Sequence, residues 1–151
     1  DLVYDTSRAA DPIIDKHPEY KEAIQAFYGR FLEMIEGVYQ ENIDLALRLK
    51  KEGYQIYLLS NFPGDQFEKY RLQNSFLDEF DDKIISGDVG LAKPDIKIYE
   101  LSIKKFNLVP EESLFIDDKI ENILGAKQAG IKTIHLQDPK KLTSLIKHYI
   151  I

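Results

Sequence analysis

The chain has 151 residues, of which 44% are hydrophobic and 30% are charged. These are the proportions of an ordinary globular domain, and they exclude disordered, collagen-like and coiled-coil chains. The net charge of −6 argues against the basic surface that binds nucleic acid. No apolar run approaches the roughly 18 residues of a membrane span, and the lack of cysteine excludes disulfides and thiolate metal sites. We therefore expect a soluble cytoplasmic domain without a nucleic-acid or membrane partner.

The first third of the chain has the pattern of amphipathic helices. Between residues 18 and 35 the apolar side chains, among them Ile24, Phe27 and Phe31, recur at spacings of three and four residues. A second run of this kind begins near Ile43 and reaches the lysines before Gly53, where a helix is expected to end. This part of the sequence predicts helices and no strand.

Short apolar runs then alternate with longer helical patterns. The expected strands are residues 56–59, 84–85, 114–116 and 133–136. The expected helices start near residue 65, span 96–106 and 120–129, and run from 139 to the end. Such alternation predicts an α/β fold, a Rossmann-like parallel sheet with helices on both faces.

Polar residues follow the predicted strands at the edge of the sheet where ligands bind in such folds. Ser60 and Asn61 end the first strand, Asp117 and Asp118 end the third, and Lys93 lies in the loop after the second. Each of these patterns also has an ordinary structural explanation. Ser60 and Asn61 could form a turn or helix cap, the segment with Lys93 could start a helix, and the acidic pair could favour a helix N-terminus. Their order and their positions at strand ends favour a common site.

The chemistry of these residues fits a phosphoryl group and a divalent cation. Adjacent carboxylates such as Asp117 and Asp118 repel each other, and a cation relieves that repulsion. Mg²⁺ accepts one or two carboxylates and keeps waters and substrate phosphate as its other ligands. The Ser60 hydroxyl, the neighbouring backbone N–H groups and the Lys93 ammonium are suited to anionic oxygens.

Three segments in series resemble motifs of the haloacid dehalogenase-like (HAD) hydrolase superfamily. Residues 57–61 (YLLSN) resemble its second motif, residues 89–95 (VGLAKPD) its third, and residues 114–122 (LFIDDKIEN) its acidic fourth. The segment 125–131 (GAKQAGI) resembles the helix that follows. The resemblance implies a HAD core over residues 37–151 and part of a helical cap over residues 1–36.

The resemblance also implies a role for each motif residue. Ser60 would hydrogen-bond the phosphoryl group, Asn61 would contact substrate or shape the loop, and Lys93 would offset negative charge. Asp118 would bind Mg²⁺ directly, with Asp117 acting through metal-bound water or orienting its neighbour. Asn122 would support the loop after the acidic pair. Because dehalogenases of this family usually lack that pair, the resemblance favours a phosphatase of small phosphorylated metabolites.

The first motif of the family, an apolar strand followed by Asp-x-Asp-x-Thr/Val, has no good match before Ser60. Its first Asp attacks phosphorus to form an aspartyl-phosphate. Asp5 is the only remote candidate, and Ser7 would then replace the general acid. By resemblance the missing strand lies between those ending at Ser60 and Asp117. We therefore expect the chain, which begins with Asp1, to be inactive until a preceding segment, another polypeptide or a rearrangement completes it. A homo-oligomer is the alternative partner to such a complementing segment.

Two other classes of protein compete with a Mg²⁺-dependent phosphatase. One is an inactive HAD-fold binding or regulatory module, and the other is a 2-haloacid dehalogenase. A phosphorylation-receiver domain is excluded by order, because receivers place the acidic pair first and the lysine last. The histidines, which share no metal-ligand spacing, are expected in packing or surface positions: His17, His135 and His148.

Overall fold

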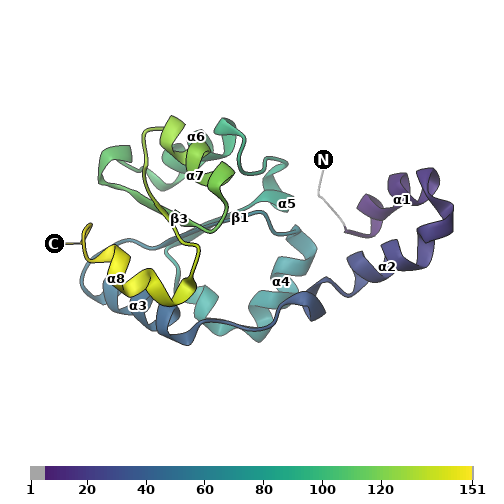
Figure 1. The fold of residues 1–151 in the computed structure, drawn as a ribbon, viewed down its shortest axis with the longest axis horizontal. Coiled ribbons are helices and arrows are strands. Elements are labelled where there is room, and N and C mark those ends of the chain that lie inside the picture. Colours follow the sequence, from purple (N-terminus) through teal and green to yellow (C-terminus); the bar gives the residue numbers. More distant parts are fainter. Residues whose placement is uncertain (1–5, 151) are drawn as a thin grey trace.

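The computed structural model describes residues 6–150, with side chains from residue 10 onward. Its strands are β1 (Tyr57–Ser60), β2 (Asp82–Ile85), β3 (Leu114–Asp117) and β4 (Lys132–His135). Its α-helices are α1 (Thr6–Lys16), α2 (Lys21–Gly29), α3 (Gln40–Lys51), α4 (Gly64–Gln73), α5 (Ser86–Val89), α6 (Ile96–Phe106), α7 (Ile120–Gln128) and α8 (Leu142–Ile146). Short 3₁₀ helices are η1 (Pro18–Tyr20), η2 (Phe31–Met34), η3 (Ser75–Glu79), η4 (Pro110–Glu112) and η5 (Pro139–Lys141). The fold is mixed α/β, as predicted (Figure 1).

The four strands form two parallel pairs. In one, β1 pairs with β2 and Ser60 lies opposite Ile85; in the other, β3 pairs with β4 and Asp117 lies opposite His135. Within the described residues no strand joins β1 to β3. The alternating pattern predicts parallel strands, and the structure has them in two pairs, which we call half-sheets, with no hydrogen-bonded ladder between β1 and β3.

Helices cover both faces of the half-sheets and enclose two apolar clusters. The first cluster centres on Ile84, Ile98 and Tyr99, with helices α6 and α7 contributing to it. The second centres on Leu45 and Leu49 of α3, packed with β4 and α8. Ribbons of α6 and α7 lie on one side of the strands and those of α3 and α8 on the other (Figure 1). This is the layered arrangement expected of a parallel sheet.

Helix α6 shows how the sequence defines element boundaries. The Asp95 carboxylate accepts a hydrogen bond of 3.0 Å from the Lys97 backbone N–H and so caps the helix N-terminus. At the other end Asn107 adopts a left-handed conformation with φ of 53°, which asparagine tolerates better than most residues. These two residues fix the helix directly after the loop that carries Lys93.

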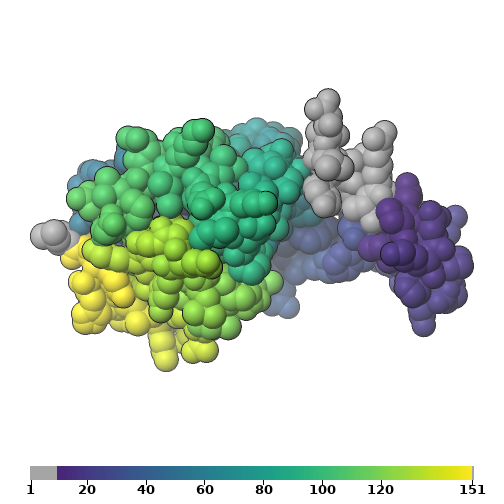
Figure 2. Space-filling view, turned by 90° about the horizontal axis from the view of Figure 1, so that it is seen from above, coloured from purple at the N-terminus to yellow at the C-terminus, as the bar shows by residue number. Residues whose placement is uncertain are grey.

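The N-terminal helices α1 and α2 form a hairpin that projects away from the strands (Figure 1). Figure 2 shows the same separation, with the purple helices standing off from the green and yellow body. The Phe31 ring of η2 contacts the Phe62 ring edge-on, with centroids 5.1 Å apart, and so ties this region to the loop after β1. A domain boundary between residues 36 and 37 stays a prediction. Among the described residues, no helix has the length and apolarity needed to cross a membrane.

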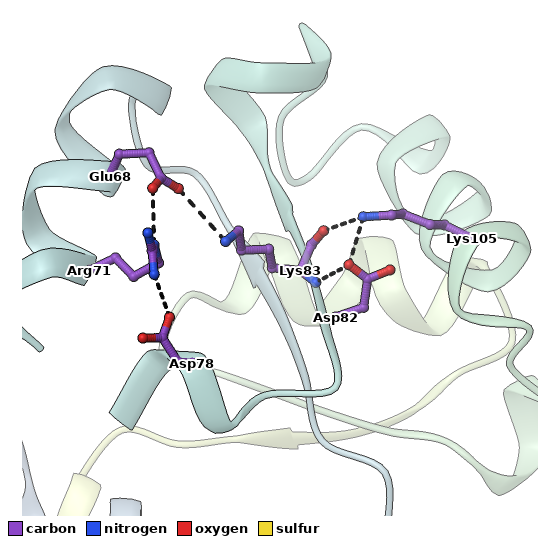
Figure 3. A network of polar contacts seen from close by, with 6 residues as sticks. All are labelled: Glu68, Arg71, Asp78, Asp82, Lys83 and Lys105. Carbon is purple, nitrogen blue, oxygen red and sulfur yellow. Dashed lines mark hydrogen bonds and ion pairs between the residues drawn. The ribbon is translucent and has the colours of Figure 1, made fainter. Parts of the chain in front are cut away.

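A network of surface ion pairs connects α4, η3, β2 and α6 (Figure 3). Arg71 of α4 bridges the carboxylates of Glu68 and Asp78 at 3.0 and 2.6 Å. Lys105 of α6 lies 2.9 Å from Asp82 at the start of β2. Because these side chains are partly or largely exposed to solvent, each pair is expected to contribute little to the free energy of unfolding.

Predicted and observed elements differ at both ends of the chain. The patterned segment 18–35 is interrupted, with α2 flanked by the 3₁₀ helices η1 and η2. Helix α1 was not predicted separately, since Pro12 inside it weakens the helical signal. The predicted last helix is wrong in extent, because α8 ends at Ile146. Asp5 lies outside the described residues, and so does the side chain of Ser7.

Candidate active site

The Lys93 ammonium lies at the carboxyl ends of β1 and β3 and connects the two half-sheets. Its Nζ donates hydrogen bonds to the Leu59 carbonyl of β1 at 2.9 Å and to Asp117 Oδ2 of β3 at 2.7 Å. The Phe115 ring centroid is 5.4 Å from the same nitrogen. The side chains of Lys93 and Asp117 are only 10% and 7% exposed. The structure thus places a buried ammonium, paired with a carboxylate, at the carboxyl ends of both strands.

The Asp117 carboxylate is held by three donors. Besides the bond from Lys93, its Oδ1 accepts hydrogen bonds of 2.9 Å from the Lys119 backbone N–H and from Asn122 Nδ2. Burial raises the pKa of this carboxyl, but the bonds from Lys93, Lys119 and Asn122 outweigh it and hold the pKa below its ordinary value. Asp117 is therefore ionised and fixed in orientation at neutral pH.

The Asn61 side chain fixes the loop that carries Lys93. Asn61 Oδ1 accepts a hydrogen bond of 2.8 Å from the Lys93 backbone N–H, and Asn61 Nδ2 donates one of 2.8 Å to the Lys93 carbonyl. This reciprocal pair joins the segment after β1 to a loop 32 residues later in the chain. Ser60 precedes Asn61 as the last residue of β1, at the same edge of the half-sheet.

Asp118 directly follows β3 and is exposed. Its backbone carbonyl lies 2.9 Å from His135 Nε2 at the end of β4. Among the described residues, no group of three or more acidic or histidine side chains is placed to hold a metal. The two adjacent carboxylates, Asp117 and Asp118, nevertheless match Mg²⁺, which binds through one or two carboxylates together with water and substrate phosphate.

A buried layer under the site supports Asp117. Tyr99, which is 0% exposed, donates its hydroxyl to the Asn122 carbonyl at 2.8 Å. Asn122 is itself buried and donates to Asp117. Burial raises the pKa of the Tyr99 hydroxyl, and the nearby Asp117 charge adds to that effect, so the hydroxyl stays a donor. Tyr99 and Asn122 thus form a chain of hydrogen bonds from α6 through α7 to the carboxylate.

The lowered pKa of Asp117 predicts that acid weakens the fold. Because the folded-state pKa lies below the unfolded value, the ionised carboxylate contributes stability that is present above the ordinary Asp pKa of about 3.9 and is lost as pH falls through the folded pKa. Urea unfolding between pH 7 and pH 3 should show this loss. In the Asp117→Asn variant the free energy of unfolding should change less with pH over the lowest part of this range. An unchanged slope of that free energy against pH would contradict the role given to the Asp117 carboxylate.

Removing the Tyr99 hydroxyl should lower the stability of the fold while the ring still fills its place in the apolar core. Tyr99→Phe keeps the ring but leaves the buried Asn122 carbonyl without this donor, at an expected cost of about 1–3 kcal/mol in the free energy of unfolding. Tyr149→Phe, at a side chain that is 46% exposed, is the matched control and should change it by less than about 0.5 kcal/mol. Equal losses in both variants would show that the Tyr99 hydroxyl supports nothing.

The structure brings the residues singled out in the sequence together at the carboxyl ends of β1 and β3. Lys93 contacts Asp117 and Asn61, Asn122 contacts Asp117, and Ser60 and Asp118 adjoin them. Sequence reasoning missed Tyr99, which was placed only in an apolar helix face, and no sequence signal marks its contact with Asn122. It also expected His135 in packing or at the surface. The end of a predicted strand was the signal that could have placed His135 at this edge.

Comparison with known proteins finds phosphatases among the proteins that are similar in sequence to this chain. The chain is 34% identical over 94 residues to the sesquiterpene phosphatase of Aspergillus oryzae, covering 62% of this chain and 48% of that protein. It is 40% identical over 90 residues to the glyceraldehyde 3-phosphate phosphatase of Pyrococcus furiosus, covering 58% and 37%. The chain thus spans less than half the length of these relatives.

Structural similarity extends over more of the chain. A HAD family enzyme of Bacteroides thetaiotaomicron, solved with magnesium and inorganic phosphate, matches with a TM-score of 0.74 and 25% identity. That match covers 94% of this chain and 72% of the other. The family model of haloacid dehalogenase-like hydrolases matches residues 7–130. With its fold, its strand-end residues and this match, the chain belongs to the haloacid dehalogenase-like hydrolases.

Proposed function

We propose that this chain is the core of a Mg²⁺-dependent phosphatase that acts on a small phosphorylated metabolite through an aspartyl-phosphate. The observation that carries the proposal is the buried Lys93 ammonium, held by Asp117 and by the Leu59 carbonyl at the edge where Ser60 ends β1. Relatives that are phosphatases, and a structural neighbour solved with magnesium and phosphate, support it.

Ser60, Asn61 and Lys93 bind and orient the phosphoryl group in this proposal. The Ser60 hydroxyl donates to a phosphoryl oxygen, and the Lys93 ammonium offsets the charge on the phosphoryl group and on the attacking carboxylate. Asn61 keeps the Lys93 backbone in place through its two hydrogen bonds. Positioning of this kind supplies much of the catalysis in phosphoryl transfer.

Asp118 and Asp117 would hold Mg²⁺. When bound, the cation would stabilise the negative charge that develops on the phosphoryl oxygens. Asp118 is the exposed member of the pair and the proposed direct ligand. Asp117 accepts three hydrogen bonds, so its part is to orient the loop or to bind through water. His135 holds the Asp118 backbone carbonyl and Asn122 holds Asp117.

The nucleophile in this proposal is an Asp outside the described residues. Among those residues, Asp117 is the carboxylate within hydrogen-bond distance of Lys93 Nζ. Its oxygens accept hydrogen bonds from Lys93, Lys119 and Asn122, and in this proposal they hold the loop beside the cation. The attacking carboxylate in this proposal is a second one, which lies beside the Lys93 ammonium when it reacts.

A panel of substrates tests the proposal. The intact protein is incubated with aryl, sugar and prenyl phosphates and with a 2-halocarboxylic acid, and released phosphate and halide are both measured. Phosphate release that requires Mg²⁺ supports the proposal, whereas halide release would show a dehalogenase. Absence of both, from protein of verified mass, would favour an inactive binding or regulatory module.

One substitution links turnover to the acidic pair. Asp118→Asn should lower phosphate release by at least about 100-fold, because it removes the charge that binds the cation. Asp44→Asn on the exposed side of α3 makes the same chemical change away from the site and should leave the rate unchanged. Equal rates in both variants would contradict the assignment of Asp118.

A further inference from the structure

His135 is the last residue of β4 and lies beside the acidic pair. In the β3–β4 register it is opposite Asp117. Its neighbours Ile134 and Leu136 pack into the second apolar cluster. Because side chains alternate along a strand, the imidazole belongs to the opposite face, the one that α6 and α7 cover (Figure 1). β4 thus ends with a half-buried polar ring at the edge that carries the proposed cation ligands.

Strand β4 holds two consecutive carbonyl groups of the acidic loop. The Leu136 backbone N–H donates to the Asp117 carbonyl at 2.9 Å and so extends the β3–β4 ladder. One residue further, where β3 has ended, His135 Nε2 lies 2.9 Å from the Asp118 carbonyl. A carbonyl oxygen only accepts, so the ring donates through Nε2–H. The imidazole therefore continues by one residue what backbone pairing does along the strands.

This hydrogen bond acts on the less restrained member of the acidic pair. The Asp117 carboxylate accepts three hydrogen bonds. The Asp118 side chain is exposed, and within residues 10–150 its carboxylate takes part in no hydrogen bond or ion pair. The position of the Asp118 carboxylate therefore depends on its backbone. That backbone is held by Leu136 at the preceding carbonyl and by His135 at its own.

We propose that His135 is a positioning residue for the divalent cation: it fixes the Asp118 backbone so that the carboxylate meets the cation in one orientation. The inference rests on the proposed function, because it takes Asp118 as the ligand. Mg²⁺ tolerates little departure from octahedral geometry, so a rotation of the backbone at Asp118 would misplace the ligand oxygen. The ring contributes through the Asp118 carbonyl and is not itself a ligand.

Two amide variants test whether the position of the donor matters. His135→Gln carries an amide N–H about as far from the backbone as His135 carries Nε2–H. His135→Asn carries the same group one methylene nearer to the backbone, so it falls short of the Asp118 carbonyl. Both variants lack the ring, and the loss of its packing affects both alike. His148→Asn, on exposed surface near the end of the chain, is the control away from the site.

Metal binding is measured on the intact protein without substrate. Free Mn²⁺ is followed by its electron paramagnetic resonance signal during a titration, and Mg²⁺ is then added as the competitor. His135→Asn should bind both cations at least about tenfold more weakly, as on loss of a group that orients a metal ligand. His135→Gln should keep most of the affinity, and His148→Asn should match the unmodified protein. Equal affinities of His135→Asn and His135→Gln would overturn the proposal.

The dependence of turnover on Mg²⁺ separates positioning of the ligand from a part in the reaction itself. His135→Asn should need more Mg²⁺ for half-maximal phosphate release. At saturating Mg²⁺ its rate should approach that of the unmodified protein, because the ring acts only through the Asp118 carbonyl. A rate that stays low at saturating Mg²⁺, together with an unchanged affinity for Mn²⁺, would overturn the proposal.

Asp118→Asn distinguishes failure of this inference from failure of the proposed function. If Asp118→Asn loses Mn²⁺ binding while His135→Asn binds as well as the unmodified protein, only the role of His135 fails. If Asp118→Asn binds Mn²⁺ as tightly as the unmodified protein, or if neither binds it, the cation site of the proposed function fails and the role of His135 fails with it.

Discussion

Lys93→Met should cost more than any other single substitution at this edge of the fold. The side chain forms an ion pair of 2.7 Å with Asp117, and both partners are at most 10% exposed. Removing the ammonium leaves a buried carboxylate without its counter-charge, an effect of about 3–5 kcal/mol on the free energy of unfolding. Phosphate release by the intact protein should fall by about 100- to 1,000-fold, as on removing one group that stabilises transition-state charge.

Lys105→Met separates the effect of burial from that of losing a lysine. Lys105 also lies beside a carboxylate, 2.9 Å from Asp82, but both side chains are 42% exposed. Its replacement should cost about 0–1 kcal/mol and should not affect turnover. Urea unfolding and phosphate release of the two variants give the comparison. Similar losses in both would mean that the Lys93–Asp117 pair has no special role.

Gly125→Ala is the second substitution with a large expected effect. Gly125 lies in α7 against the site loop, and an added Cβ would come within 2.7 Å of both the Pro94 carbonyl oxygen and Tyr99 Cε2. Neither neighbour can yield easily, because one is backbone and the other a fully buried ring. We expect a loss of about 1–3 kcal/mol in the free energy of unfolding, even though alanine ordinarily stabilises a helix relative to glycine.

Gly29→Ala provides the matched control. Gly29 also lies in an α-helix, and an added Cβ there would meet nothing within 4 Å. This variant should be neutral or up to about 1 kcal/mol more stable, while Gly125→Ala should unfold earlier and turn over substrate more slowly, since Pro94 follows Lys93. Denaturant unfolding of both variants measures this difference in stability. A stable Gly125→Ala variant with normal turnover would contradict the close packing under the loop.

The alternation of apolar runs and helical patterns was sufficient to predict the strands and the site edge. The runs ending at Ser60 and Asp117 are strands in the structure, and parallel strands place their carboxyl ends together. Lys93 joins them because its loop precedes a helix with an Asp95 cap. The contacts beneath the site could not be predicted. That Tyr99 reaches Asn122, and that Gly125 admits the ring, depends on how α6 packs on α7.

The division of the sheet depended on information that local patterns do not contain. Each apolar run predicts a strand, but no run specifies its neighbours. In the structure β1 and β3 are half-buried, and among the described residues no strand lies between them. Only the resemblance to a family indicated a strand at that position.

The most direct test of the central claim is the Mg²⁺ dependence of phosphate release by the intact protein. The claim is that the residues at the carboxyl ends of β1 and β3 form a phosphoryl-transfer site with a cation at Asp118. Initial rates on an aryl phosphate are measured in EDTA and across a Mg²⁺ titration, for the unmodified protein and for Asp118→Asn. We predict turnover that appears with Mg²⁺ and is lost in the variant. Turnover that persists in EDTA, or that survives Asp118→Asn unchanged, would contradict the claim.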